Sequence, residues 1–144
     1  MLKATSIFAY IGMAGALVAL ILMGYFFSAN PLVIGVQIGA VILMVWARVV
    51  FGMRSFHAAG NPTQGGLVTR GPYRHVRHPI YTAACLLGWA GVLGHFSLIS
   101  LICGLILLFC AVVRMLCEEK LVADRYPEYV GYAAKTWRMI PYVF

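Results

Sequence analysis

The chain has 144 residues, of which 62% are hydrophobic and only 10% charged, with a formal net charge of +7. Four long apolar stretches take up most of this length and leave too little sequence for a separate soluble core. The basic residues flank these stretches without any nucleic-acid-binding motif, so membrane topology and attraction to anionic lipids explain the charge and nucleic acid is not an expected partner.

The first apolar stretch covers residues 4–27 and contains no charged residue. Its 24 residues exceed the roughly 20 that are needed to cross a hydrocarbon core of about 30 Å. A cleaved signal peptide is the alternative, because Lys3 precedes the stretch. The apolar part is too long for such a signal and no Ala-x-Ala-like cleavage site follows, so we expect a retained transmembrane helix.

The second apolar stretch, residues 32–51, completes a two-helix membrane scaffold over residues 1–51. In both stretches small residues lie one helical turn apart, which favours close helix packing within one chain or between two: Gly12 with Ala16, and Gly35 with Gly39. Gln37 is strongly polar and lies mid-helix. We expect it to form an interhelical hydrogen bond rather than to take part in catalysis.

Residues 52–77 are rich in glycine and proline, which predicts a loop that can wrap around a ligand. The third apolar stretch, residues 80–93, is short, and only Gly94 and His95 separate it from the fourth, residues 96–117. These two stretches therefore predict a tight helical hairpin. We expect an all-α integral membrane fold with about four transmembrane helices, in which the loop and the C-terminal tail close a pocket over this hairpin.

Lysine and arginine accumulate on one side of the predicted membrane helices. They occur at Lys3, within residues 54–77 and within residues 120–138, whereas the connections at residues 28–31 and 94–95 contain neither. Because basic residues favour short cytoplasmic segments, we expect a multi-pass protein with both termini and the central loop in the cytoplasm.

Polar residues gather where the third helix should begin. Pro79 suits the first helical position, which places His78 near the N-cap and leaves first-turn amide groups free to bind a carboxylate or phosphate. A structural capping role for His78 is the alternative. A metal site built from His57, His75 and His78 is not expected, because no cysteine or carboxylate completes a ligand set nearby.

At the predicted end of the fourth helix, Arg114 and Glu118 are four residues apart and share one helix face. Glu118 and Glu119 near a helix C-terminus oppose the helix dipole unless a cation compensates them. Either Arg114 or Lys120 provides that compensation, or the glutamate holds a cationic ligand and the arginine an anionic one.

These residues form a recognisable pattern, spread over the loop, the hairpin and the tail. It reads Leu67-Val68-Thr69-x-Gly71-x-Tyr73, Arg77-His78-Pro79-x-Tyr81, Arg114-x-x-x-Glu118-x-x-Leu121, Tyr129-x-x-Tyr132 and Arg138-x-Ile140-Pro141. The pattern resembles the isoprenylcysteine carboxyl methyltransferase family and the related phospholipid methyltransferases over roughly residues 50–144.

The resemblance implies an integral membrane methyltransferase whose catalytic region, residues 52–144, encloses S-adenosyl-L-methionine. The matching residues that would contact this cofactor are Leu67, Val68, Tyr73, His78, Pro79, Ile80, Tyr81 and Glu118. By the same matching, Arg114 would hold the carboxylate of a lipophilic acceptor of the isoprenylcysteine type. Arg77 and Arg138 would support the acceptor or a lipid headgroup.

The chain departs from the family pattern at the end of the fourth helix, where many relatives carry two successive glutamates. The spacing to Leu121 aligns Glu118 with the second glutamate, whereas the visible pair would move the cofactor ligand to Glu119. The methyl acceptor is not identified by the sequence. An NADPH-dependent membrane reductase and a non-enzymatic transport or assembly protein are the alternatives.

Overall fold

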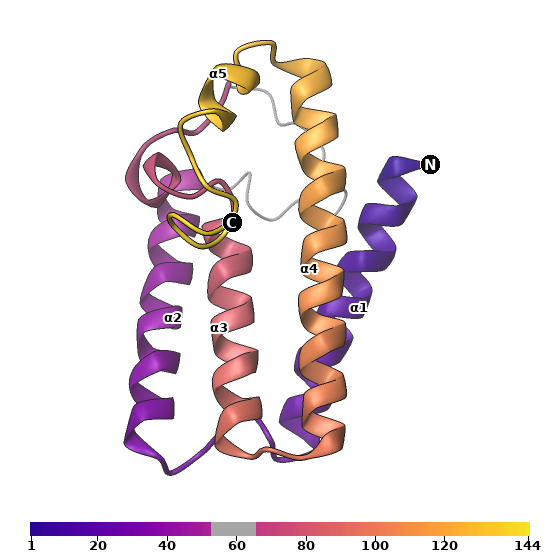
Figure 1. Cartoon of the computed structure of the whole chain (residues 1–144), viewed down its shortest axis with the longest axis vertical. Coiled ribbons are helices and arrows are strands. Elements are labelled where there is room, and N and C mark those ends of the chain that lie inside the picture. Colours follow the sequence, from indigo (N-terminus) through magenta and orange to yellow (C-terminus); the bar gives the residue numbers. More distant parts are fainter. Residues whose placement is uncertain (53–65) are drawn as a thin grey trace.

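The computed structural model describes residues 1–52 and 66–144. Helices α2, α3, α4 and α1 lie side by side in this spatial order, with alternating directions (Figure 1). The elements are α1 (Leu2–Leu22), α2 (Pro31–Phe51), the short 3-10 helix η2 (Gly71–Arg74), α3 (Pro79–Gly94), α4 (Leu98–Arg125) and α5 (Tyr129–Ala133). Within these two described ranges there is no strand, only an isolated bridge between Val76 and Trp137. The predicted all-α fold is confirmed.

Three of the helices are long and apolar enough to cross a membrane, namely α1, α2 and α4, with mean hydropathies of 2.1, 2.1 and 2.6. Helix α3 has 16 residues, which corresponds to about 24 Å at 1.5 Å per residue. It is therefore shorter than a typical hydrocarbon core of about 30 Å. The stretch that was expected to form the fourth transmembrane helix is this short, mostly buried helix between α2 and α4.

Helix α4 is longer than the sequence suggested, because it ends at Arg125 and not near Cys117. Helix-forming residues continue past the apolar stretch, and Pro127 then disfavours helical geometry at Tyr126. The two glutamates thus lie one to two turns before the helix end. The expectation that they lie near the helix C-terminus and oppose its dipole is wrong, because the dipole acts mainly within the last turn.

Small residues set the packing of α1 against α4. A Cβ atom added at Gly12 would lie 2.7 Å from Sγ of Cys110, so the two helices approach closely there, and Ala16 is buried in the same contact region. In contrast, added Cβ atoms at Gly35 and Gly39 would meet nothing within 4 Å in the described part of the chain. The face of α2 that carries these two glycines therefore points away from the other described helices.

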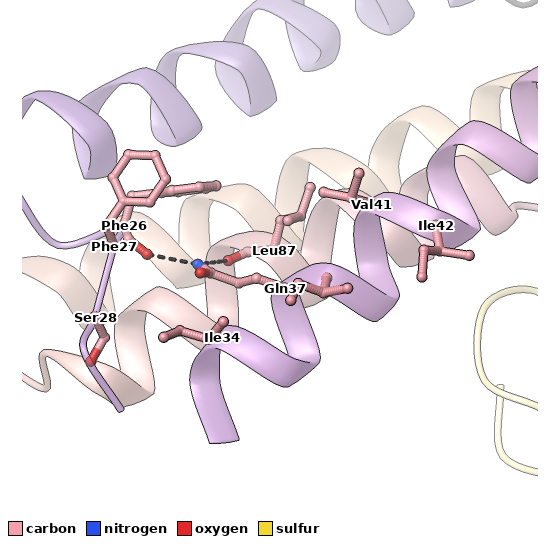
Figure 2. A pocket seen from close by; sticks show the side chains of 9 residues that line it. Phe26, Phe27, Ser28, Ile34, Gln37, Val41, Ile42 and Leu87 are labelled. Carbon is pink, nitrogen blue, oxygen red and sulfur yellow. Dashed lines mark hydrogen bonds between the residues drawn. The ribbon is translucent and has the colours of Figure 1, made fainter. Parts of the chain in front are cut away.

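The connection between α1 and α2 crosses the far end of α3, and Gly91 makes the crossing possible. A Cβ atom at Gly91 would lie 2.6 Å from the carbonyl oxygen of Tyr25 and 2.9 Å from Cα of Phe26. The side-chain amide of Gln37 donates to the carbonyl oxygens of Phe26 (2.7 Å) and Leu87 (3.5 Å) (Figure 2). The expected interhelical role of Gln37 is confirmed.

Gln37 also lines an open, largely apolar groove of about 470 Å³ along α2 (Figure 2). The groove includes the end of the α1–α2 connection, and its other lining residues are Phe26, Phe27, Ser28, Ile34, Ile38, Val41, Ile42 and Leu87. The connection between α1 and α2 lies at the opposite end of the bundle from α5 and both chain ends (Figure 1).

The predicted hairpin between α3 and α4 is present, with His95, Phe96 and Ser97 connecting the helices. Ser97 and Ser100 form a reciprocal capping box at the start of α4, in which the amide of Ser100 donates to Oγ of Ser97 at 3.1 Å. Both chain ends lie on the opposite side of the bundle from this turn (Figure 1). The segments predicted to carry the positive charge therefore share one end of the molecule, as far as the structure describes them.

Candidate active site

Backbone hydrogen bonds hold the C-terminal tail beside the start of α3. The amides of Arg77 and His78 donate to the carbonyl oxygens of Trp137 (2.7 Å) and Arg138 (3.0 Å), and the amide of Trp137 donates to the carbonyl oxygen of His75 (3.1 Å). Further along, Oγ1 of Thr82 donates to the carbonyl oxygen of Met139 at 3.0 Å. These contacts bring residues that are about 60 positions apart in the sequence to one site, an arrangement that helical periodicity alone does not predict.

Three basic side chains meet around Glu119. Oε1 of Glu119 accepts from Nε of Arg77 at 3.0 Å and lies 3.3 Å from Nε2 of His78. Nε of Arg138 donates to both carboxylate oxygens, at 3.2 and 3.1 Å. We call Arg77, His78, Glu119 and Arg138 the Glu119 cluster. The carboxylate is mostly buried, with 13% of its side chain exposed, and both of its oxygens are engaged.

Arg77 extends this cluster into the tail. Its Nη1 donates to the carbonyl oxygens of Ala133 (2.7 Å) and Thr136 (2.5 Å). Because a guanidinium presents several donors in a fixed plane, one side chain can join α4 to two turns of the tail. The Glu119 cluster therefore clamps the tail onto the bundle.

A second polar cluster lies on the neighbouring face of α4. Oε1 of Glu118 accepts from the hydroxyl of Tyr81 at 2.6 Å and pairs with Nη2 of Arg114 at 2.9 Å. Nε of Arg114 donates to the hydroxyl oxygen of Tyr81 at 2.5 Å, and its Nη1 donates to the backbone and side-chain oxygens of Ser6 at 3.0 and 3.3 Å. The ring of Tyr10 lies 4.8 Å from Cζ of Arg114. We call Ser6, Tyr10, Tyr81, Arg114 and Glu118 the Arg114 cluster.

The two clusters are adjacent. Glu118 and Glu119 are consecutive on α4, and the rings of His78 and Tyr81 stack with centroids 5.6 Å apart and an interplanar angle of 24°. Arg114 is almost fully buried, with 4% of its side chain exposed, whereas 20% of the Glu118 side chain is exposed. Two acids, three arginines and a histidine thus surround the first turn of α3.

The N-cap residue of α3 does not cap the backbone amides of that first turn with its side chain. Helix α3 begins at Pro79 with His78 at its N-cap, as the sequence predicts, and His78 makes no side-chain hydrogen bond to the turn. The His78 side chain points instead to Glu119. A capping role for the histidine side chain is therefore wrong, and within the described residues the first-turn amides keep their capacity to bind an anion.

The tyrosines of η2 and α5 connect the loop to the tail. The hydroxyl of Tyr132 donates to the carbonyl oxygen of Tyr73 at 2.7 Å. The ring of Tyr73 packs against that of Phe51 at the end of α2, with ring centroids 5.4 Å apart. Burial raises the pKa of Tyr132 to about 12, so its phenol remains a hydrogen-bond donor at neutral pH. This bond holds η2 close to the tail.

The structure thus brings most of the predicted site residues together. Arg77, His78, Tyr81, Arg114, Glu118, Glu119 and Arg138 belong to the two clusters, and Pro79 and Ile80 form the first turn of α3 between them. Tyr73 lies beside the tail, and no polar contact within the described residues joins half-buried Leu67 or Val68 to either cluster.

The histidines of the considered metal site do not form one in the described ranges. His75 is exposed, His78 contacts Glu119, and His57 lies outside the described residues. No group of three potential metal ligands occurs in the part of the chain that the structure describes. All four cysteines are free thiols.

Sequence reasoning missed the contribution of α1 to the Arg114 cluster. It treated residues 1–51 as scaffold, whereas Ser6 and Tyr10 both contact Arg114. Their spacing of four residues could have indicated this role, because it places two polar groups on one face of a largely apolar helix. Met13 and Leu17 continue that face into the core.

Comparison with known proteins identifies the family. The model of the phospholipid methyltransferase family matches residues 25–129, which include α2, α3, α4 and both glutamates. Helix α1 and the last part of the tail lie outside the matched range. No curated protein and no solved structure gives a significant match.

Proposed function

Because the chain belongs to the phospholipid methyltransferase family, we propose that it transfers a methyl group from S-adenosyl-L-methionine to a lipophilic acceptor at the membrane surface. The observation that carries this proposal is the meeting of the first turn of α3, the Glu118–Glu119 pair and the tail at one end of a membrane-spanning bundle. We place this end in the cytoplasm, together with both termini, because the basic residues collect there.

The residues at this end fit the proposed methyl donor. The donor carries a sulfonium and an ammonium group, which suit a carboxylate, and a carboxylate group, which suits the uncapped amides at the start of α3. The stacked rings of His78 and Tyr81 offer an aromatic surface beside these charges. Leu67, Val68, Tyr73, Pro79 and Ile80 would complete the cofactor contacts.

The contacts favour Glu118 over Glu119 as the cofactor ligand. Both oxygens of Glu119 are already engaged by three basic groups, which suits a structural clamp. Among the described residues, both contacts of Glu118 use Oε1, and its side chain is more exposed than that of Glu119. We infer that Oε2 of Glu118 meets the positive charge of the donor.

We propose Arg114 as the residue that orients the acceptor, with a carboxylate of the isoprenylcysteine type as the acceptor group. When bound, S-adenosyl-L-methionine would supply an electrophilic methyl group. An ionised carboxylate oxygen would form the new bond to this group in line while the methyl–sulfur bond breaks and neutral S-adenosylhomocysteine leaves, so that no general base is required. Arg114 would hold one carboxylate oxygen and leave the other free to react, so that catalysis rests on positioning in a site that excludes water.

This role requires an exchange of partners at Arg114. In the structure its Nη2 is paired with Glu118, the same side chain that would turn toward the donor. When Glu118 does so, its ion pair with Nη2 of Arg114 is broken, and the acceptor carboxylate would take the place of Glu118 at Nη2. The shared glutamate therefore favours binding of the donor before the acceptor.

An amine in a phospholipid headgroup is a second candidate acceptor. Nε, Nη1 and Nη2 of Arg114 each contact another side chain or backbone group, and Glu118 balances its charge, which lowers its attraction for an anion. The description of the matched family also names phospholipids. An amine would first need to lose a proton, and Glu118 is the nearby carboxylate that could accept it.

Methyl transfer from labelled S-adenosyl-L-methionine tests the proposal directly. The full chain in lipid nanodiscs would be offered N-acetyl-S-farnesylcysteine, which bears a carboxylate, and phosphatidylethanolamine, which bears an amine. We expect label in the first acceptor, and loss of that turnover in Arg114→Ala with binding of S-adenosylhomocysteine retained. Labelling of only the amine would select the second candidate, and labelling of neither acceptor would contradict the proposal.

A further inference from the structure

Helix α1 contacts Arg114 on two sides. Ser6 is fully buried, and its carbonyl and hydroxyl oxygens both accept from Nη1 of Arg114. One turn later, the Tyr10 ring lies against the guanidinium, 4.8 Å from Cζ. The helix thus fixes one nitrogen of the guanidinium by hydrogen bonds and one face by a cation–π contact.

The contacts from the other helices are complementary. Nε of Arg114 points to Tyr81 on α3, and Nη2 points to Glu118 on α4 itself. Because a guanidinium is planar, fixing Nη1 and a ring face from α1 determines the direction in which Nη2 points. The orientation of Arg114 therefore depends on three helices.

The α1 contacts do not involve Glu118. If Glu118 turns away from Arg114 during the reaction, Ser6 and Tyr10 still hold the guanidinium in place. A displacement of about 1 Å in a group that positions the substrate can lower the rate about 100-fold. Contacts that keep Arg114 in place would therefore have a large effect on the rate of methyl transfer.

We propose that Ser6 and Tyr10 are positioning residues for Arg114, which makes α1 part of the acceptor side of the site. This inference rests on the proposed function, in which Arg114 orients the acceptor. Both residues lie outside the range matched by the family model, so family membership assigns them no role. Tyr10 is 40% exposed on an apolar membrane helix, which places part of its ring toward the bilayer, from which a lipophilic acceptor would come.

The test replaces Tyr10 in the full chain in lipid nanodiscs. Tyr10→Leu removes the ring that covers Arg114, and Tyr10→Phe retains the ring and removes only the hydroxyl. Phe8→Leu is the matched control, because Phe8 is an aromatic residue on the same helix with 73% of its surface exposed. Ser6→Ala provides a smaller change, because the carbonyl contact to Arg114 remains.

Two measurements are made on each variant. The first is the rate at which phenylglyoxal, an apolar arginine reagent, modifies Arg114, followed by mass spectrometry. The second is kcat/KM for whichever of N-acetyl-S-farnesylcysteine and phosphatidylethanolamine the unmodified protein methylates, together with the Kd for S-adenosylhomocysteine.

For Tyr10→Leu we expect about tenfold faster labelling of Arg114 and about tenfold lower kcat/KM, with an unchanged Kd for S-adenosylhomocysteine. Tyr10→Phe should keep the labelling rate of Arg114 and kcat/KM close to those of the unmodified protein, and Phe8→Leu should match the unmodified protein in both. Unchanged labelling in Tyr10→Leu, or faster labelling without loss of kcat/KM, would overturn the inference. If the unmodified protein methylates neither acceptor, the proposed function fails, whereas the labelling rates still decide whether α1 positions Arg114.

Discussion

The substitution Glu119→Gln should release the C-terminal tail. It keeps the shape of the side chain but removes the negative charge shared by Arg77, His78 and Arg138. Two buried or half-buried cations would then face a neutral amide. Because Arg77 also binds the tail backbone at Ala133 and Thr136, the loss should loosen the tail more than the helices.

The expected magnitude follows from the burial of each pair. The side chains of Arg77 and Glu119 are only 9% and 13% exposed, and breaking such a buried pair costs about 3–5 kcal/mol. The side chain of Arg138 is 35% exposed, so its pair adds only about 0–1 kcal/mol. One oxygen acceptor remains in glutamine, so we take about 3 kcal/mol as the net cost. This corresponds to roughly a 100-fold rise in the undocked fraction of the tail.

Limited trypsin digestion measures that fraction. Cleavage after Lys135 or Arg138 requires the segment paired with residues 75–78 to detach, and the cleavage rate follows the open population when reclosing is fast. We expect about 100-fold faster cleavage in Glu119→Gln. Glu128→Gln is the control, because Glu128 is exposed in the same tail. A change of less than about threefold in Glu119→Gln would refute the assignment of Glu119 as the clamp.

Three further predictions concern the cofactor and the packing. Glu118→Gln should weaken binding of S-adenosyl-L-methionine by at least about tenfold in calorimetry, since a charge-assisted contact to the donor is lost, whereas unchanged affinity would remove its assigned role. Gly91→Ala should lower the free energy of unfolding by about 2 kcal/mol or more, seen as a lower melting temperature, because the new methyl group meets the backbone of Tyr25. Gly39→Ala, with open space around its Cβ position, should not lower it, and equal melting temperatures for the two variants would contradict the packing. Gln37→Leu should cost about 1 kcal/mol because two carbonyl oxygens lose their donor, and a melting temperature at or above that of the unmodified protein would argue against this bond.

The membrane helices could be predicted from the sequence because hydropathy and length determine them. The start of α3 was equally predictable, since Pro79 fits only the first turn of a helix at that position. The end of α4 was not, because its last two turns are polar and the apolar run stops at Cys117. Their helical state depends on intrinsic propensity and on the stop at Pro127, not on hydrophobic periodicity.

The sequence predicted which side chains gather at this end of the bundle, but not how they pair. The spacing of Arg114 and Glu118 predicted that they share a helix face, and their ion pair is one of the alternatives that the sequence left open. The partners of Glu119 come from the start of α3 and from the tail, and no periodic pattern relates these segments. The contact of Ser6 with Arg114 spans 108 positions and depends on α1 packing against α4 instead of its sequence neighbour α2.

Calorimetry with the full chain in lipid nanodiscs tests the central claim most directly. The claim is that the start of α3 and Glu118 of α4 together hold a positively charged methyl donor. We predict heat of binding with S-adenosyl-L-methionine, none with NADPH, and loss of the first signal in Glu118→Ala with retention in Glu119→Ala. Binding of NADPH in place of S-adenosyl-L-methionine, or loss of the signal only in Glu119→Ala, would contradict the account.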